Sequence, residues 1–170
     1  DVGLFFFAGH GFQFDGLNYL AATDTSFADD RSAAYTSFRL DDIIAAMNRS
    51  NILIKILIID ACRSSSVSGS RGIGTGFAPI FAPRGTIIAF ATSPGQTAKE
   101  RGEHGLFTAA ILEHIMTKNI TIENMIKRVR NTVYMWSNAT QVTWEHTSLM
   151  GDFVFNKNKE EITKDIYCRE

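Results

Sequence analysis

The chain has little of what marks several large protein classes. Its 170 residues include only two cysteines, Cys62 and Cys168, too few for a disulfide scaffold, so we expect a reducing, cytoplasmic compartment. No apolar run approaches the roughly 18 residues that a membrane-spanning helix needs, and Lys55 interrupts the strongest one. The formal net charge of -1 gives no electrostatic reason to expect nucleic acid or an anionic membrane as a partner. The composition, 45% hydrophobic and 21% charged, is that of one globular domain.

Apolar, β-branched runs predict the strands of a buried sheet. The strongest run is Leu53–Ile59, which is typical of a strand buried on both faces. Val2–Ala8 and Gly85–Thr92 have the same character, a short strand is predicted at Asn18–Ala21, and a last one at Ser148–Phe155.

Apolar residues at helical spacing predict helices between these strands. They cover Arg39–Arg49, with Ser37 as the cap, then Gly105–Lys118, and a third segment that begins at Thr121. Segments 12–35 and 63–84 are otherwise predicted as loops, and 156–170 as a charged, frayed tail. Strands that alternate with helices predict an α/β fold with a mostly parallel sheet covered on both faces.

A histidine and a cysteine follow two of the predicted strands. His10 lies between Gly9 and Gly11, and Cys62 comes 52 positions later, which is room for one crossover helix between neighbouring parallel strands. An imidazole can generate a thiolate nucleophile and later protonate a leaving amine. The backbone N–H groups of Gly11 and Cys62 are candidates for an oxyanion hole. Either residue alone would more often be structural; together they favour a catalytic pair.

The motifs around these residues resemble the caspase-like cysteine peptidases, within them the metacaspase and paracaspase branch found in bacteria. The resemblance rests on Phe7–Gly11 (FAGHG), Asn18–Leu20 with Asp24, and Leu57–Arg63 (LIIDACR), with further likeness at Ser93, Gln96–Ala98 and Gly105–Thr108. Against the caspase signature Q-A-C-[RQG]-G the chain departs at Asp60 and at Ser64. An Asp two positions before the Cys is usual in the metacaspase-like pattern.

The resemblance implies a three-layer α/β/α sandwich over residues 1–155, with a junction between large and small subunits at about 63–84. The family's first strands precede the histidine strand, and they are expected to be missing from this chain. The implied activity is that of an endopeptidase, with Cys62 as nucleophile and His10 as acid and base, acting on a protein or peptide. Since bacterial members often lie beside other domains, a regulatory domain or partner chain is also expected.

Asp60 is interpreted as a specificity group. A carboxylate beside a thiol raises the pKa of that thiol, so Asp60 would be a poor base for Cys62. At the floor of the first substrate pocket it would instead pair with Arg or Lys, whereas true caspases bind Asp there through arginines. Asp24 or Glu100 could share the pocket, and the strand exit at Ser93 could pair with an extended peptide. The alternative is a strand-end Asp that accepts hydrogen bonds from a loop backbone.

A preference for basic residues makes Arg71 and Arg84 candidate self-cleavage sites, the alternative being an uncut loop. No cofactor is expected, because the histidines do not form H-E-x-x-H or another metal spacing. Calcium dependence occurs in parts of the family, but the sequence shows no dedicated calcium loop. A second functional hypothesis is a catalytically silent scaffold that keeps the fold for protein binding.

Overall fold

The computed structural model describes residues 1–63, 77–78, 80–93, 98–101 and 104–158 of the chain. Its six-stranded sheet has the order β3-β2-β1-β4-β5-β8, and β6 and β7 form a separate two-stranded sheet. The strands are β1 (Val2–Phe14), β2 (Leu17–Ala21), β3 (Ser37–Arg39), β4 (Ile54–Arg63), β5 (Thr86–Phe90), β6 (Glu100–Arg101), β7 (His104–Gly105) and β8 (Trp144–Thr147). The helices are α1 (Asp30–Tyr35), α2 (Leu40–Arg49), α3 (Leu106–His114) and α4 (Ile122–Trp136).

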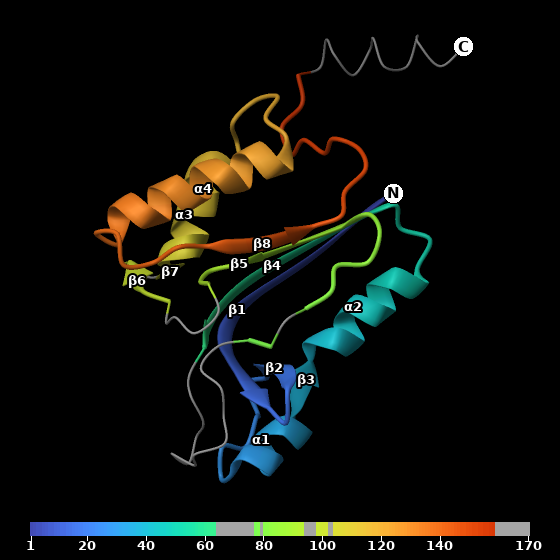
Figure 1. Cartoon of the computed structure of the whole chain (residues 1–170), viewed down its shortest axis with the longest axis vertical. Helices are drawn as coiled ribbons and strands as arrows, with labels where there is room; N and C mark the ends of the chain where they lie inside the picture. Colours follow the sequence, from blue (N-terminus) through green and yellow to red (C-terminus); the bar gives the residue numbers. More distant parts are fainter. Residues whose placement is uncertain (64–76, 79, 94–97, 102–103, 159–170) are drawn as a thin grey trace.

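The sheet is mixed, with a parallel centre. β1, β4 and β5 run parallel to one another, while β2, β3 and β8 are added in antiparallel orientation. Helices α3 and α4 lie on one side of the sheet and α2 on the other (Figure 1). The predicted α/β sandwich is therefore confirmed, and the parallel pairing is confined to the three central strands. We call the side at which these three strands end the carboxyl edge.

β4 holds the two layers together because its side chains alternate between two cores. Ile56 and Ile58 pack with α3 and α4, whereas Leu57 and Ile59 pack with α2. All four side chains are at most 3% exposed, and burial of each contributes about 2 kcal/mol. A strand buried in this way needs a helix on each face, which explains its continuous apolar run.

The helix predictions are confirmed, and Thr121 caps α4 by accepting a hydrogen bond from Asn124 N. Ser37 as a helix cap is wrong, because Ser37 belongs to β3 and α2 begins without a side-chain cap. The segment predicted as a loop after Gly11 contains the end of β1 and also α1. Asp29 caps α1 by accepting a hydrogen bond from Ser32 N at 2.9 Å.

The predicted last strand, Ser148–Phe155, is also wrong. The strand beside β5 is formed by Trp144–Thr147, just before it in the chain. Leu149, Phe153 and Phe155 pack against the α3–α4 core from irregular chain. These residues are apolar because they are packed against that core. Such packing does not require pairing as a β-strand.

One edge of β1 carries exposed apolar side chains. Among the described residues, β2 pairs with Gly11–Phe14, and no strand pairs with the outer edge of β1 before Gly11. Leu4 is 53% exposed and Phe6 is 48% exposed on this stretch. Such an edge can accept a further strand.

In the part of the chain that the structure describes, no helix has the length and apolar character needed to cross a bilayer.

Candidate active site

The sheet places His10 and Cys62 side by side. They are register partners in the parallel pair β1–β4, so their α-carbons lie about 4.8 Å apart across the ladder. His10 is exposed, and for Cys62 the structure describes the main chain. Both residues belong to the strands themselves and do not follow them as predicted, because β1 continues to Phe14 and β4 to Arg63. The pairing of two positions 52 residues apart depends on the crossover through α2, which returns the chain parallel to β1.

The glycines beside His10 are explained by packing. A Cβ atom on Gly11 would lie 2.7 Å from Cζ of Phe77, and one on Gly9 would lie 3.0 Å from Cζ of Phe7. Phenylalanine rings thus occupy the space that a side chain would need at both positions. Packing against these rings therefore accounts for a glycine on each side of His10. The backbone N–H groups of Gly11 and Cys62 stay candidates for an oxyanion hole.

Asp60 is buried and bound to the start of α3. It is 6% exposed, and its Oδ2 accepts hydrogen bonds from Thr108 N at 3.0 Å and from Thr108 Oγ1 at 2.5 Å. Gly105, the N-cap residue of α3, has no side chain to cap the helix, and a Cβ there would lie 2.3 Å from Asp60 Oδ2. The Asp60 carboxylate therefore takes the place of the missing cap. This contact is close to the structural alternative for Asp60, but its donors belong to the first turn of a helix and not to a loop. It involves the Oδ2 oxygen of the carboxylate.

The other predicted substrate-binding residues are placed less directly. Ser93 follows β5 at the carboxyl edge, but its N–H and its hydroxyl both donate to the carbonyl of Val142, at 2.8 and 3.1 Å. Asp24 is exposed in the turn after β2, a strand that runs antiparallel to β1 and so back from the carboxyl edge. Glu100 contributes its main chain to β6.

Arg84 lies at the opposite end of the sheet. Its carbonyl accepts a hydrogen bond from Lys55 Nζ at 3.2 Å, and Gly85 N donates to Ser148 O at 3.1 Å. Lys55 is seven positions before Cys62 on β4, which corresponds to about 23 Å along the strand. The Arg84–Gly85 peptide bond thus lies in a turn, where Gly85 has a φ of 75°. It is far from Cys62 of the same molecule. Arg71 lies outside the described residues.

A buried amide fixes the chain next to the histidine strand. Asn18 is 1% exposed; its Nδ2 donates to Ala78 O at 3.1 Å, and its Oδ1 accepts from Ala78 N at 2.6 Å. The ring of Phe77 then packs over Gly11, with its centroid 5.4 Å from that of Phe90. The carboxyl end of the junction segment is therefore anchored beside β1.

Sequence reasoning assigned no role to several of these groups. Thr108 and Asn18 lie in motifs that carry the family resemblance, which was a signal, but their contacts depend on tertiary structure. Gln141, fully buried near the end of β5, gave no signal at all. Within the described residues, no three His, Cys, Asp or Glu side chains gather closely enough to hold a metal ion.

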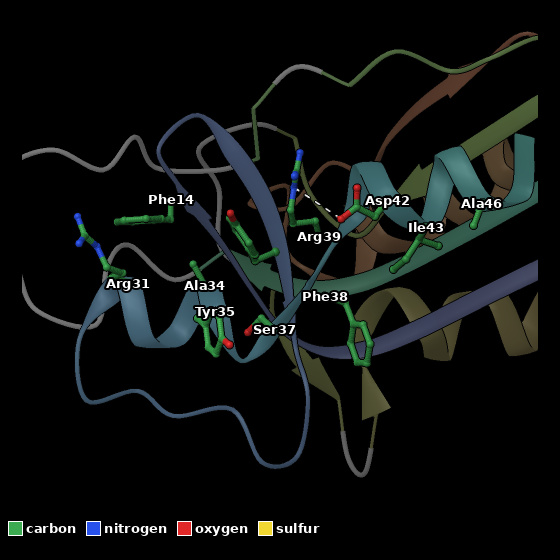
Figure 2. A pocket seen from close by; sticks show the side chains of 11 residues that line it. Phe14, Arg31, Ala34, Tyr35, Ser37, Phe38, Arg39, Asp42, Ile43 and Ala46 are labelled. Atoms are coloured by element: carbon green, nitrogen blue, oxygen red, sulfur yellow. Dashed lines mark ion pairs between the residues drawn. The ribbon is translucent and has the colours of Figure 1, made fainter.

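The hollow of about 630 Å³ shown in Figure 2 is a different place from this site. It lies beside α1, β3 and α2, and Tyr35, Phe38 and Arg39 contribute to its wall. Its lining, among the residues that the structure describes, includes arginines and an aspartate but neither Cys nor His. It therefore offers neither a thiol nor an imidazole.

Comparisons with known proteins agree with this fold. A family model described as the caspase domain matches residues 1–154. Among solved structures, the crystal structure of caspase-1 from Spodoptera frugiperda matches with a TM-score of 0.59 and 18% identity. The match covers 93% of this chain and 62% of that chain, so this chain spans less than two thirds of the caspase-1 length. A search of curated proteins finds no match.

The fold and the family match define a caspase-like α/β protein. The chain belongs to the caspase domain family.

Proposed function

We propose that the chain is a cysteine endopeptidase in which Cys62 is the nucleophile and His10 the general acid and base. The observation that carries this proposal is the register of β1 and β4, which opposes the two positions at the carboxyl edge of the sheet. Opposed positions in a parallel pair share a face of the sheet, and ligands of open α/β sheets bind beyond the strand ends. The motif LIIDACR further supports the metacaspase and paracaspase branch.

The proposed reaction is an acyl transfer in two steps. His10 accepts the thiol proton, the Cys62 sulfur attacks the scissile carbonyl, and backbone N–H groups at Gly11 and Cys62 stabilise the oxyanion. His10 then gives the proton to the leaving amine as the C–N bond breaks and a thioester remains. Water, deprotonated by His10, hydrolyses the thioester and regenerates the thiol. This chemistry needs no metal or organic cofactor.

We propose a substrate with Arg or Lys before the scissile bond. Asp60 lies two residues before Cys62 on β4, on the same face of the strand and about 6.6 Å along it. Its Oδ2 is engaged by Thr108, and in the proposal Oδ1 receives the guanidinium or ammonium group of the substrate. Arg71 remains the better proposal for self-cleavage, because the fold holds the Arg84–Gly85 bond away from Cys62. The reducing compartment and a regulatory partner stay part of the proposal.

The test is hydrolysis of fluorogenic peptides by the intact protein, compared with Cys62→Ala and His10→Ala. We expect cleavage after Arg and loss of at least about 1,000-fold in kcat/KM in either variant. Equal signals from wild type and Cys62→Ala would contradict a peptidase and favour the silent scaffold. A peptide with Asp before the scissile bond serves as the specificity control, and its preferential cleavage would contradict the role of Asp60.

A further inference from the structure

Gln141 is a fully buried amide in the segment between α4 and β8. Its side chain is 0% exposed; Nε2 donates to Ala91 O at 2.9 Å, and Oε1 accepts from Lys99 N at 2.8 Å. Its main chain is fixed as well, because Gln141 N donates to Ser137 Oγ at 3.0 Å. Ser137 is itself 2% exposed at the end of α4. The amide is thus held rigidly on the helical layer.

The two partners of this amide are the two ends of the segment that leaves β5. Ala91 continues β5 beside β4, since its N–H donates to Ile59 O at 3.1 Å, one residue before Asp60. Lys99 comes just before β6, and its carbonyl accepts a hydrogen bond from Leu106 N, the first residue of α3. Gln141 therefore connects the end of β5, the start of β6 and, through Lys99, the helix that Asp60 caps.

The neighbouring residue Val142 fixes Ser93 as well, because the Val142 carbonyl accepts hydrogen bonds from both the N–H and the hydroxyl of Ser93. Main-chain groups at Ala91, Ser93 and Lys99 are thus fixed from one short stretch, residues 141–142. The carboxamide donates with one atom and accepts with another, whereas an ionised Asp or Glu can only accept and Met cannot donate, so none of these reproduces both contacts.

We propose that Gln141 is a positioning residue for substrate binding. It sets the main chain on both sides of the β5 exit, next to Asp60 and the strand of Cys62. In this proposal an extended peptide substrate pairs with the main chain at the β5 exit. This inference rests on the proposed peptidase function. It predicts that loss of the amide weakens substrate binding more than it slows the chemical step at Cys62.

The experiment compares wild type, Gln141→Met and the control Lys55→Met in the intact protein. Lys55 is 6% exposed and donates to Arg84 O at the other end of β4, so its loss matches the burial of Gln141 without touching the β5 exit. With an Arg-terminated tetrapeptide we expect Gln141→Met to raise KM at least about tenfold, as for a lost buried hydrogen bond. The rate at which iodoacetamide alkylates Cys62 should stay within about threefold of wild type, because this reagent needs no peptide pairing.

Gln141→Glu provides a second variant with a pH signature. The carboxylate can only accept, whereas the protonated carboxyl group both donates and accepts, as the native amide does. Its KM, relative to wild type at the same pH, should therefore approach the wild-type value as pH falls from about 8 to about 5. Among the described side chains, the charged groups beside this segment are Lys99, whose Nζ donates to Ser137 O, and Arg130, whose Nε donates to Thr143 O and which forms an ion pair with Glu145. All three are retained in every variant.

The outcomes separate the two proposals. If wild type and Cys62→Ala hydrolyse the peptide equally, the peptidase function fails, and this inference with it. If wild type is active but Gln141→Met and Lys55→Met have the same KM, only the role of Gln141 is overturned. If Gln141→Met does not fold, Gln141→Glu decides: a KM ratio that does not change with pH overturns the positioning role.

Discussion

The two roles assigned to Asp60 can be separated by two substitutions at that position. Asp60→Ala leaves Thr108 N and Thr108 Oγ1 without their acceptor. Hydrogen bonds to a charged acceptor contribute about 1.5–3 kcal/mol each, and Thr108 is half-buried, so water can replace part of the loss. We therefore expect Asp60→Ala to lower the free energy of unfolding by about 3 kcal/mol. Asp60→Asn keeps an acceptor oxygen in the same place and should cost about 1 kcal/mol.

Substrate specificity should depend on the charge at residue 60. A carboxylate at the floor of the pocket distinguishes arginine from citrulline, its neutral isostere, by about 100-fold in kcat/KM, or about 2.7 kcal/mol. Asp60→Asn removes the charge, so the preference should fall below about fivefold although the fold is nearly unchanged. Thr108→Val is the matched control: it removes one hydrogen bond to Asp60, keeps the charge, and should keep the preference for arginine.

Stability is measured by urea denaturation in the Cys62→Ala background, and specificity by kcat/KM for the paired peptides in the active protein. If Asp60→Asn keeps the wild-type preference for arginine over citrulline, the specificity role is refuted. If Asp60→Ala and Asp60→Asn unfold at the same urea concentration, the helix-capping role is refuted instead.

Three further predictions concern regions away from Asp60. Arg84→Ala should leave the set of self-cleavage sites unchanged, because the fold keeps that bond away from Cys62. Apart from the mass difference of the substitution itself, the same fragments should appear, and loss of a fragment would contradict this. The Ser32 hydroxyl, followed by the Ser32 N–H, holds the pKa of Asp29 below its usual 3.8. The contribution of Asp29 to stability is thus present above its unfolded pKa and is lost as pH falls below about 4, so wild type should lose more stability than Asp29→Asn in acid unfolding curves. Leu4 is 53% exposed, so Leu4→Lys should reduce aggregation, measured by light scattering, and lower the free energy of unfolding in urea by about 1 kcal/mol or less. A larger loss of stability would show that this side chain is covered.

Local patterns predicted the central strands and helices, since burial leaves a direct trace in sequence. Leu53–Ile59 is apolar because β4 is covered on both faces, and the apolar stripe of α4 follows from one-sided packing. Ser148–Phe155 was misread because its apolar residues pack on the core without pairing as a strand. The packing of Phe77 over Gly11 could not be predicted, because Phe77 is distant in sequence and a glycine alone does not indicate what it contacts.

The sequence by itself determined the class of the protein. Its motifs at His10 and Cys62 indicate the family, and its hydrophobic periodicity predicts the sheet and the helical layers that cover it. Only the tertiary structure decided the register that opposes those two residues, the contact of Asp60 with α3, and the double hydrogen bond of Gln141. The physical reason is that apolar burial acts on short, local stretches, whereas these contacts join positions about 40 to 50 residues apart. Their partners are specified by chain topology, which no single stretch encodes.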